Sequence, residues 1–466
     1  MRTPVRAMAA AAAAMVMAVT AGACGAAAPE GPEGAPNAIT VWTMENLPER
    51  LAAQQAIATR FTRSTGIAVD LVGVAEDQFN QLVMSAAASG ELPDVVGAVP
   101  LAAVRSLAAN ELLDPAVSAA VVESLGVDTF SARALELTRD GATQLAVPSD
   151  AWAQLLLYRR DLFAAAGLQE PRTFADVLTA ARALDDGDTA GFVGSTIPGD
   201  AFTQQTFEHL ALANGCELVD GAGEVALDSP PCVESFAFYS DLVRNFSVEG
   251  AQDVDSTRAT YFAGKAAMVV WSSFILDELA GLRADAAPSC AQCVADPRFL
   301  VDNTGVVTAL TGPSGREPAQ FGEVVSWAVL ADAAVDPSRR FVEYMMSEGY
   351  ADWLGFAPEG KFPTRTGTRS NPQEYTEAWR TLPAGVDTKA PLADFYPPAV
   401  LTALETSPDT FRRWGITQGQ GGLVGAMLGE LPVPQAISAM TGGEVEPHRA
   451  AEQADADVSD IQNSLR

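Results

Sequence analysis

Apolar strand-like segments alternate with helical segments between residues 39 and 99, and this alternation constrains the fold more than any other feature of the chain. Nearly continuous apolar strands separated by helices are typical of a parallel, doubly wound α/β sheet. The expected strands are Ile39–Trp42, Ile67–Val74 and Asp94–Val99, with helices from Pro48 to the turn at Gly66 and over Gln78–Ala88, the first of them capped by Glu45 or Asn46.

The carboxyl ends of these strands are where a ligand is expected, because ligands of open α/β sheets bind beyond those ends. Here the ends are Thr43–Asn46 and Pro100–Leu101, which are far apart in the sequence. We therefore expect the two loops to be neighbours in space.

A second block of strands and helices begins near Val147–Pro148 and continues into the apolar strand Leu155–Tyr158. Thr173 and Asp176 have the spacing of a helix capping box. Helical spacing also predicts helices over residues 202–213, 232–244, 256–262 and 337–347 and in the tail from 442 onward. Roughly 430 residues beyond the leader exceed what one hydrophobic core supports, so two lobes are expected.

The N-terminal residues predict export. Arg2 and Arg6 precede an apolar run from residue 7 to 19, and Ala21-Gly22-Ala23 lead into Cys24. This order predicts a secretory signal peptide over residues 1–23. Its ending resembles a bacterial lipobox, in which Cys24 becomes the lipidated first residue, and ordinary signal peptidase cleavage is the alternative. Residues 24–37, rich in Ala, Pro, Gly and Glu, predict a lipidated tether.

The chain is strongly acidic, with a formal net charge of -30. Nucleic acid and anionic membrane surfaces are therefore unfavourable partners. No segment after the leader contains an uninterrupted apolar stretch of about 18 residues, the length that a membrane helix needs. We expect contact with the membrane through the lipid anchor only, at the extracellular face of the cell membrane, and no nucleic-acid partner.

Four cysteines remain once Cys24 is assigned to the anchor, and an even number suits disulfides in an oxidising compartment. Cys216 and Cys232 bracket a hairpin-like segment around Gly221-Ala222-Gly223, so we expect them to pair. Cys290 and Cys293 form a C-x-x-C in an apparent loop without a following helix, which favours a structural disulfide over a redox centre.

Several short motifs occur in an order that spans nearly the whole chain. They are Ile39–Trp42, Leu92–Val96, Leu157–Phe163 with Ala166–Leu168, Pro171–Ala181, Ala213–Gly215, Phe262–Met268 and the stretch from Phe341 through Pro363. Together they resemble the extracellular solute-binding protein family 1, the maltose-binding-protein-like ABC importer receptors, in their actinobacterial lipoprotein type. The resemblance implies a periplasmic-binding protein type II fold, two α/β lobes with a ligand cleft between them, and a monomer that works with ABC transporter permease subunits.

The resemblance also implies that the chain crosses between the lobes three times, near Val147, Thr311–Gln320 and Thr366–Tyr375. The expected segments are residues 38–147 and 312–368 for the two parts of lobe 1, and residues 148–311 and 369–466 for the two parts of lobe 2.

A receptor for a sugar needs aromatic faces against the C–H side of the ring and polar groups at its hydroxyls. By the resemblance, Trp271 and Trp414 match stacking positions, and Trp152 lies at the first crossing. Trp42, Trp327, Trp353 and Trp379 are expected in the core. The complete set of expected ligand contacts is Thr43, Glu45, Asn46, Gln78, Pro100, Asp150, Trp152, Gln205, Trp271, Ser272, Glu323 and Trp414.

The rival class is a secreted hydrolase, because fold alone does not decide function. His209 and His448 are the only histidines, and no G-x-S-x-G or H-E-x-x-H occurs. Paired carboxylates for glycoside hydrolysis stay open, because their separation depends on the fold. A receptor of the same fold for a peptide or another solute is a further alternative. We expect no cofactor and no metal.

Overall fold

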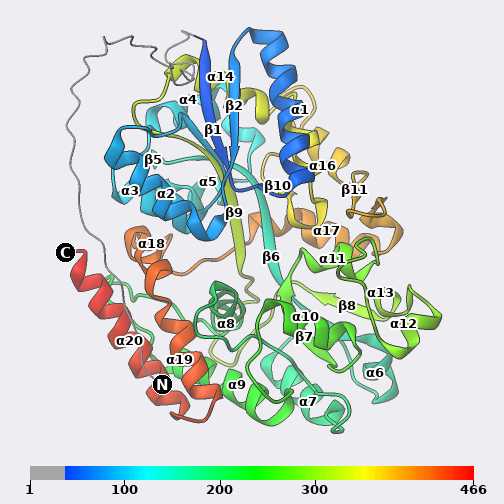
Figure 1. Cartoon of the computed structure of the whole chain (residues 1–466). Coiled ribbons are helices and arrows are strands. Elements are labelled where there is room, and N and C mark those ends of the chain that lie inside the picture. Colours follow the sequence, from blue (N-terminus) through cyan, green and yellow to red (C-terminus); the bar gives the residue numbers. More distant parts are fainter. Residues whose placement is uncertain (1–36) are drawn as a thin grey trace, which may run out of the picture. The chain divides into compact units, whose positions relative to one another are not determined.

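One long strand, β6 (Val147–Arg159), takes part in the sheets of both lobes in the computed structural model, which describes residues 37–466 (Figure 1). Its first half pairs with β9 (Gly322–Val329) and β10 (Phe362–Pro363). Its second half pairs with β7 (Met268–Ser272) and β8 (Thr304–Val307). The predicted signal peptide, Cys24 and all but the last residue of the predicted tether lie outside the described residues. The predicted lobe boundaries stay predictions.

The sheet of the first lobe has the order β10-β6-β9-β3-β1-β2. Strand β1 (Ala38–Thr43) is parallel to β2 (Ala68–Gly73) and to β3 (Val95–Pro100), which confirms the predicted parallel, doubly wound part. Strand β9 runs antiparallel to both β3 and β6. The carboxyl ends of β1 and β3 therefore lie at one sheet edge, and β9 begins at that same edge.

Helices α1 (Pro48–Thr65) and α2 (Glu76–Ser89) connect these strands, as predicted. Gly66 ends α1 in the left-handed conformation that glycine adopts readily, at φ 76°. The predicted cap by Glu45 or Asn46 is wrong, because Leu47 stands at the cap position without a side-chain hydrogen bond. The carboxylate of Glu45 is instead engaged by Arg50 and Lys361.

Apolar packing forms a core within the first lobe and a larger core, centred in the second lobe, that continues into the first through Leu101 and Leu137. In the first lobe, Trp327 and Trp353 lie with ring centroids 4.9 Å apart, and a Cβ on Gly97 would come within 2.2 Å of the Trp327 ring. In the second lobe, the strand residues Leu155–Leu157 pack among helices that include α8 (Ala201–Ala213) and α9 (Pro230–Phe246). Trp327, Trp353 and Trp379 are fully buried, as predicted, whereas Trp42, also expected in the core, is half-buried.

The capping box at Thr173 and Asp176 is confirmed at the start of α7 (Phe174–Leu184). The other helices are α3 (Leu101–Ala109), α4 (Pro115–Leu125), α5 (Ala132–Leu137), α6 (Arg160–Ala165), α10 (Val254–Phe262), α11 (Ile275–Leu279), α12 (Ala291–Ala295), α13 (Phe299–Asp302), α14 (Val335–Met345), α15 (Tyr350–Leu354), α16 (Glu374–Trp379) and α17 (Pro398–Thr406). The short elements are β4 (Arg139–Asp140), β5 (Thr143–Gln144), β11 (Pro383–Ala384), β12 (Ala390–Pro391) and the 3₁₀ turns η1 (Val127–Thr129), η2 (Pro358–Gly360), η3 (Leu392–Asp394) and η4 (Ser407–Asp409).

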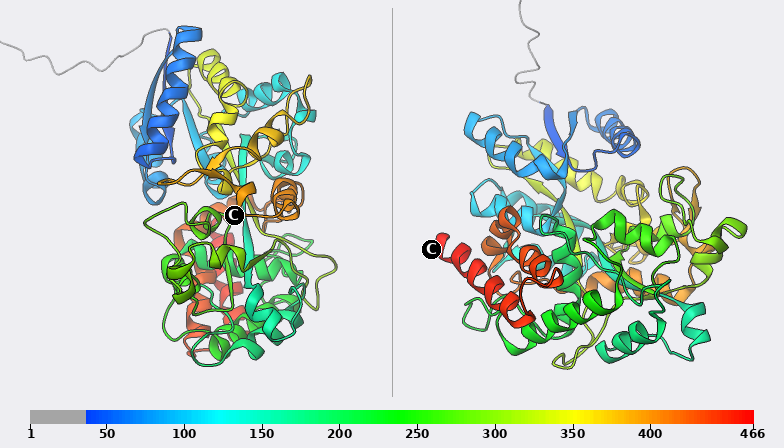
Figure 2. Two further views of the ribbon diagram at one scale, coloured as in Figure 1. Left: turned by 90° about the vertical axis from the view of Figure 1, so that its right-hand side faces the viewer. Right: turned by 60° about the horizontal axis from the view of Figure 1, so that its bottom comes forward.

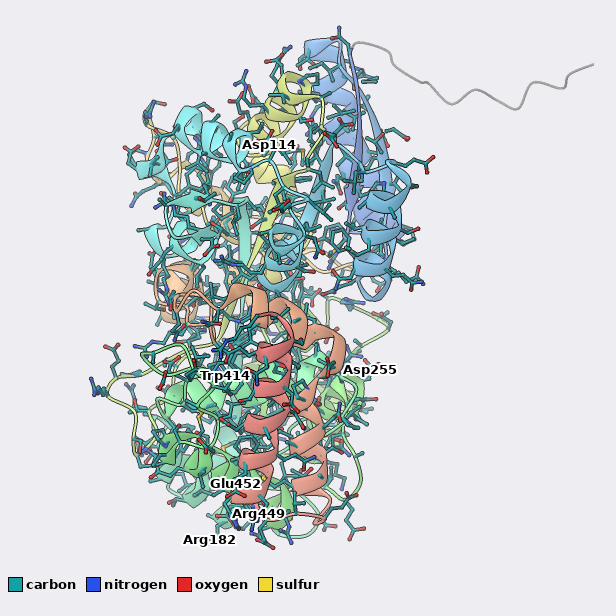
Figure 3. All side chains as sticks on the ribbon, turned by 90° about the vertical axis from the view of Figure 1, so that its left-hand side faces the viewer. Asp114, Arg182, Asp255, Trp414, Arg449 and Glu452 are labelled. Atoms are coloured by element: carbon teal, nitrogen blue, oxygen red, sulfur yellow. A yellow bond between two sulfur atoms is a disulfide. The ribbon has the colours of Figure 1, made fainter. Side chains whose placement is uncertain are left out.

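The last three helices are α18 (Gly421–Glu430), α19 (Pro432–Thr441) and α20 (Pro447–Ser464). Helices α19 and α20 run along the second lobe, whereas α18 packs against α3 of the first lobe, where an added Cβ on Gly425 would come within 3.0 Å of the Ser106 nitrogen (Figure 2). Arg449 and Glu452 form an ion pair of 2.6 Å on α20 (Figure 3). Within residues 37–466, no single helix is both long and apolar enough to cross a membrane, whereas α18 and α19, bent by 53°, meet these criteria as a pair.

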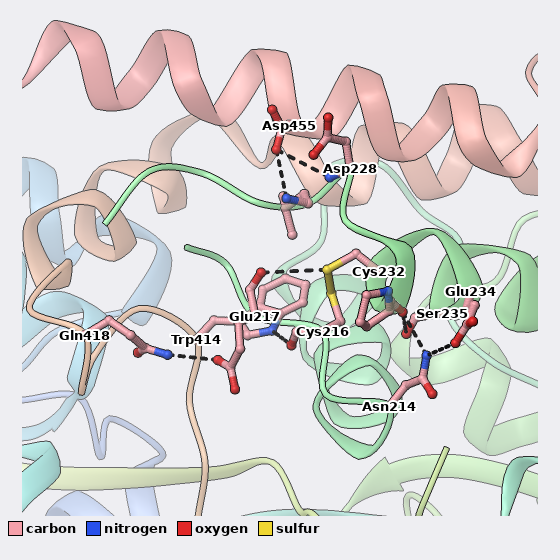
Figure 4. Close-up of a disulfide and its surroundings, with 12 residues drawn as sticks. Asn214, Cys216, Glu217, Asp228, Cys232, Glu234, Ser235, Trp414, Gln418 and Asp455 are labelled. Carbon is pink, nitrogen blue, oxygen red and sulfur yellow. Dashed lines mark hydrogen bonds between the residues drawn. A yellow bond between two sulfur atoms is a disulfide. The ribbon is translucent and has the colours of Figure 1, made fainter. Parts of the chain in front are cut away.

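Both cysteine pairs are disulfides in the structure. Cys216 and Cys232, with Cα atoms 4.6 Å apart, join the segment after α8 to the first turn of α9 (Figure 4). Cys290 and Cys293 are bonded at a Cα separation of 4.9 Å. The expectation that no helix follows Cys290 is wrong, because the Cys290 sulfur accepts the Cys293 N–H and caps α12.

Candidate ligand-binding site

Charged side chains meet where β1 ends. The Glu45 carboxylate lies 2.9 Å from Nη1 of Arg50 and 2.5 Å from Nζ of Lys361. The Lys361 ammonium also lies 3.2 Å from Asp150, which accepts a hydrogen bond of 2.6 Å from the Trp353 indole. Burial opposes ionisation of Glu45, but Lys361 and then Arg50 outweigh it and lower the pKa of Glu45 to about 2. Glu45 therefore stays charged at physiological pH.

Aromatic rings line the adjoining part of β6. Alternate residues of a strand share one face, so Trp152 lies on the same face as Asp150 and Gln154. Trp152 is half-buried, with its ring centroid 6.2 Å from Phe274 and 5.8 Å from Phe321. These rings and the charged group at β1 adjoin, because the Arg50 guanidinium lies 5.9 Å from the centre of the Phe274 ring.

A second buried charge network lies on the other side of Trp152. Glu323, the register partner of Trp152 on β9, accepts the backbone N–H of Leu101 at the start of α3, at 2.8 Å. The Arg413 guanidinium bonds both Glu323 and Glu208, and it lies 4.5 Å from the centre of the Phe321 ring. These contacts connect the carboxyl end of β3 to the second lobe through β9.

The structure brings half of the predicted ligand contacts together. Hydrogen bonds, ion pairs or strand register link Thr43, Glu45, Pro100, Asp150, Trp152 and Glu323 around the ends of β1 and β3 and the start of β9. Ser272 joins this face of the sheet, because it pairs with Gln154. Asn46 is exposed beside Glu45, Gln78 is exposed in the first turn of α2, and Gln205 is half-buried in α8.

Two predicted stacking residues lie inside the second lobe instead. Trp271 is 5 % exposed, its indole N–H donates to the Val254 carbonyl at 3.0 Å, and its pairing with Leu155 places it on the opposite face of the sheet from Trp152. Trp414 is 2 % exposed and donates its indole N–H to the Cys216 carbonyl at 2.8 Å (Figure 4). Such burial favours a core role, and ligand contact by either residue stays a prediction.

Sequence reasoning missed Phe274, Arg50, Lys361 and Arg413. Phe274 follows Trp271 by three residues, and only the geometry distinguishes the two. Lys361 carried a usable signal, because the chain has only three lysines and this one precedes the apolar pair Phe362-Pro363. A lysine in such a place needs a carboxylate partner when it is buried.

Two α/β lobes joined by shared strands, with buried charges and half-buried aromatic rings at the strand ends, define a periplasmic-binding protein type of solute receptor. The chain belongs to the bacterial extracellular solute-binding protein family, whose model matches residues 45–352. A putative ABC transporter periplasmic-binding protein of Escherichia coli K12, YcjN, is 28 % identical over 324 residues, covering 68 % of this chain and 70 % of that protein.

Solved structures share the fold over almost the whole chain. The GacH receptor of Streptomyces glaucescens, studied unliganded and with acarbose, has a TM-score of 0.67 at 21 % identity and covers 92 % of this chain and 98 % of its own. Maltose-bound MalE3 of T. maritima has a TM-score of 0.68 at 16 % identity, with 91 % and 99 % covered. The periplasmic-binding protein fold that the sequence predicted is confirmed.

Proposed function

We propose that this solute-binding protein captures a mono- or oligosaccharide for an ABC importer by closing its two lobes on the ligand. The observation that carries the proposal is the half-buried Trp152 ring, set between Phe274 and Phe321 and flanked by the charged groups at Glu45 and Glu323. An aromatic face takes the C–H side of a sugar ring, while carboxylates and guanidinium groups bond its hydroxyls.

The comparisons support a carbohydrate, since the solved relatives include receptors bound to acarbose and maltose. The similarity to YcjN supports the importer, because that protein is named as an ABC transporter component. We assign Trp152 and Phe274 to the sugar ring, and Glu45, Asp150, Glu323 and Arg50 to hydroxyl groups or to holding the rings in place.

The test is calorimetric titration of the protein without its leader against maltose, acarbose and a panel of mono- and oligosaccharides, with peptides as the alternative class. We expect at least one sugar to bind and the radius of gyration to fall on binding. Trp152→Ala should weaken that sugar by on the order of 2 kcal/mol, about 30-fold, as truncation of a buried aromatic anchor does. Its cost to folding should stay below the 3–5 kcal/mol, roughly, of a core tryptophan.

Trp327→Ala is the matched control, because Trp327 is fully buried in the first lobe and the ring contacts that it makes are with Phe341 and Trp353. It should destabilise folding strongly while any folded fraction retains the sugar affinity. Trp271→Ala tests the sequence-based prediction. A folded variant with weakened sugar binding would support ligand contact by Trp271, whereas a destabilised variant that still binds sugar would support a core role. Binding only of peptides, or release of sugar products from the oligosaccharides, would replace the proposal with one of its rivals.

We further propose that the protein acts as a monomer held at the extracellular face of the membrane by a lipid on Cys24, and that it binds its ligand without turnover. The lipobox-like residues before Cys24 support the anchor. Family membership supports binding without catalysis, since the family consists of solute-binding proteins. The permease subunits of the importer are then the protein partners.

A further inference from the structure

Two carboxyl groups are buried where η2 meets α11. Asp277 and Glu359 are each 2 % exposed. In the described part of the chain, Oδ1 of Asp277 and Oε2 of Glu359 have no hydrogen-bond partner. A buried charge without a partner is costly, so either at least one of these carboxyl groups is neutral or the packing of η2 against α11 has to loosen.

The segments that carry these two carboxyl groups pack around the Phe274 ring, which is one of the rings assigned to the ligand. An added Cβ on Gly360, the residue after Glu359, would come within 2.0 Å of the Phe274 ring, so η2 packs against that ring without space between them. Asp277 follows Phe274 on the same segment, and Lys361 follows Glu359 into the ion pairs with Glu45 and Asp150. The two carboxyl groups therefore join the segment that bears Phe274 to the segment that bears Lys361.

The neighbouring cations are engaged elsewhere. Arg50 pairs with Glu45 at 2.9 Å, and Arg283 pairs with Asp285 at 2.9 Å. Arg50 and Arg283 lower the pKa of both Asp277 and Glu359 by their positive charge, although within the described residues neither arginine forms an ion pair with these two carboxyl groups. The charged and titratable groups that act on Asp277, Glu359 and the adjacent Glu278 are Arg50 from α1, Arg258 from α10, Arg283 and Asp285 after α11, and Tyr396 after η3.

Burial outweighs these cations. It raises the pKa of Asp277 to about 6, and it raises the pKa of Glu359 well above the usual range, with the Asp277 charge adding to the effect. A carboxyl whose pKa is raised by a contact holds its proton more tightly when that contact is made. Protonation therefore favours the contact and ionisation opposes it.

We propose that the buried carboxyl groups of Asp277 and Glu359 form a pH-sensitive joint that keeps η2 packed against Phe274 while at least one of them is protonated, so that ionisation of both drives the two segments apart. The joint rests on the proposed function in two respects, namely that Phe274 belongs to the ligand site and that the two lobes close on the ligand. Acid then stabilises the closed arrangement of the lobes, and raising the pH above neutrality favours opening and ligand release.

The experiment measures the distance between the lobes without any ligand. Nitroxide labels on Gln55→Cys in α1 and Asn245→Cys in α9, both exposed positions, report it by pulsed electron paramagnetic resonance. In the parent protein we expect the fraction of longer distances to rise at least about threefold between pH 5 and pH 8.5. Glu359→Gln, which cannot ionise, should abolish this rise, and Asp277→Asn should do the same by an independent route.

Asp302→Asn is the control, because it removes a carboxylate on α13 whose side chain is 50 % exposed and which is not among the groups that act on Asp277, Glu359 and Glu278, and it should behave like the parent. A distance distribution that is the same at both pH values, or a Glu359→Gln protein that still responds like the parent, overturns the joint. Because no sugar is present, this failure would leave the calorimetric evidence for carbohydrate binding intact. A failed sugar titration would likewise leave the distance response unaffected.

Discussion

At the scale of single residues, the position along β6 decides which tryptophan is available to a ligand. Trp152 shares its face of the strand with Asp150, whereas Trp271 pairs with Leu155 on the other face and is bonded inside the second lobe. Both residues are tryptophans on strands, so composition does not separate them. Strand pairing does, because a shift of one residue moves a side chain to the opposite face.

The buried carboxyl of Glu359 should make stability depend on pH. Its pKa is raised in the folded protein by burial, so folding takes up a proton between the unfolded pKa near 4 and the higher folded pKa, and the free energy of unfolding falls as the pH rises through that window. Because glutamine cannot ionise, Glu359→Gln should not show this fall in the free energy of unfolding. We expect the variant to be more stable than the parent by about 1–3 kcal/mol at pH 8 and nearly equal to it at pH 4.5.

Urea unfolding at the two pH values measures this difference, with Asp302→Asn as the control for loss of an exposed carboxylate. A stabilisation of equal size at both pH values would mean that packing, and not ionisation, is responsible.

At the scale of elements, the two disulfides differ in the length of chain that they close. Cys216–Cys232 spans a sequence separation of 16 and fixes the segment whose Cys216 carbonyl receives the Trp414 indole N–H. Cys290–Cys293 spans a separation of 3 and caps one short helix. Closing a longer loop removes more freedom from the unfolded chain.

Replacing Cys216 and Cys232 together with Ser should therefore lower the free energy of unfolding by about 3 kcal/mol. The matched variant that replaces Cys290 and Cys293 should lose less. Denaturant unfolding of both variants and the parent under oxidising conditions measures the difference, and equal losses would contradict the loop-length argument.

At the scale of the whole molecule, the proposed anchor at Cys24 determines where the receptor works. Cys24→Ser should release the protein from the membrane fraction into the medium, since a lipid can no longer be attached. Cell fractionation and intact mass of the exported protein measure this. Cys216 and Cys232 are disulfide-bonded and offer no substitute attachment site, so membrane retention of the variant would rule out Cys24 as the anchor.

Local patterns in the sequence determined much of this protein. The apolar runs at β1, β2 and β3 with helices between them predicted the parallel part of the sheet, because strands that are connected through helices pair in parallel. Thr173 and Asp176 predicted a helix start, because a capping box depends on residues three apart. The strand ends at Thr43–Glu45 and Pro100 predicted where polar groups gather.

Only the tertiary structure decided which distant residues complete the site. Lys361 reaches Glu45 and Asp150 because β10 pairs with β6, and Arg413 reaches Glu323 from a segment 90 residues further along the chain. Phe274, and not the larger Trp271, lies beside Trp152 because of the register between β7 and β6. The pKa values of Asp277 and Glu359 are raised chiefly by burial. Burial and register depend on how the whole chain packs, so no local pattern contains them.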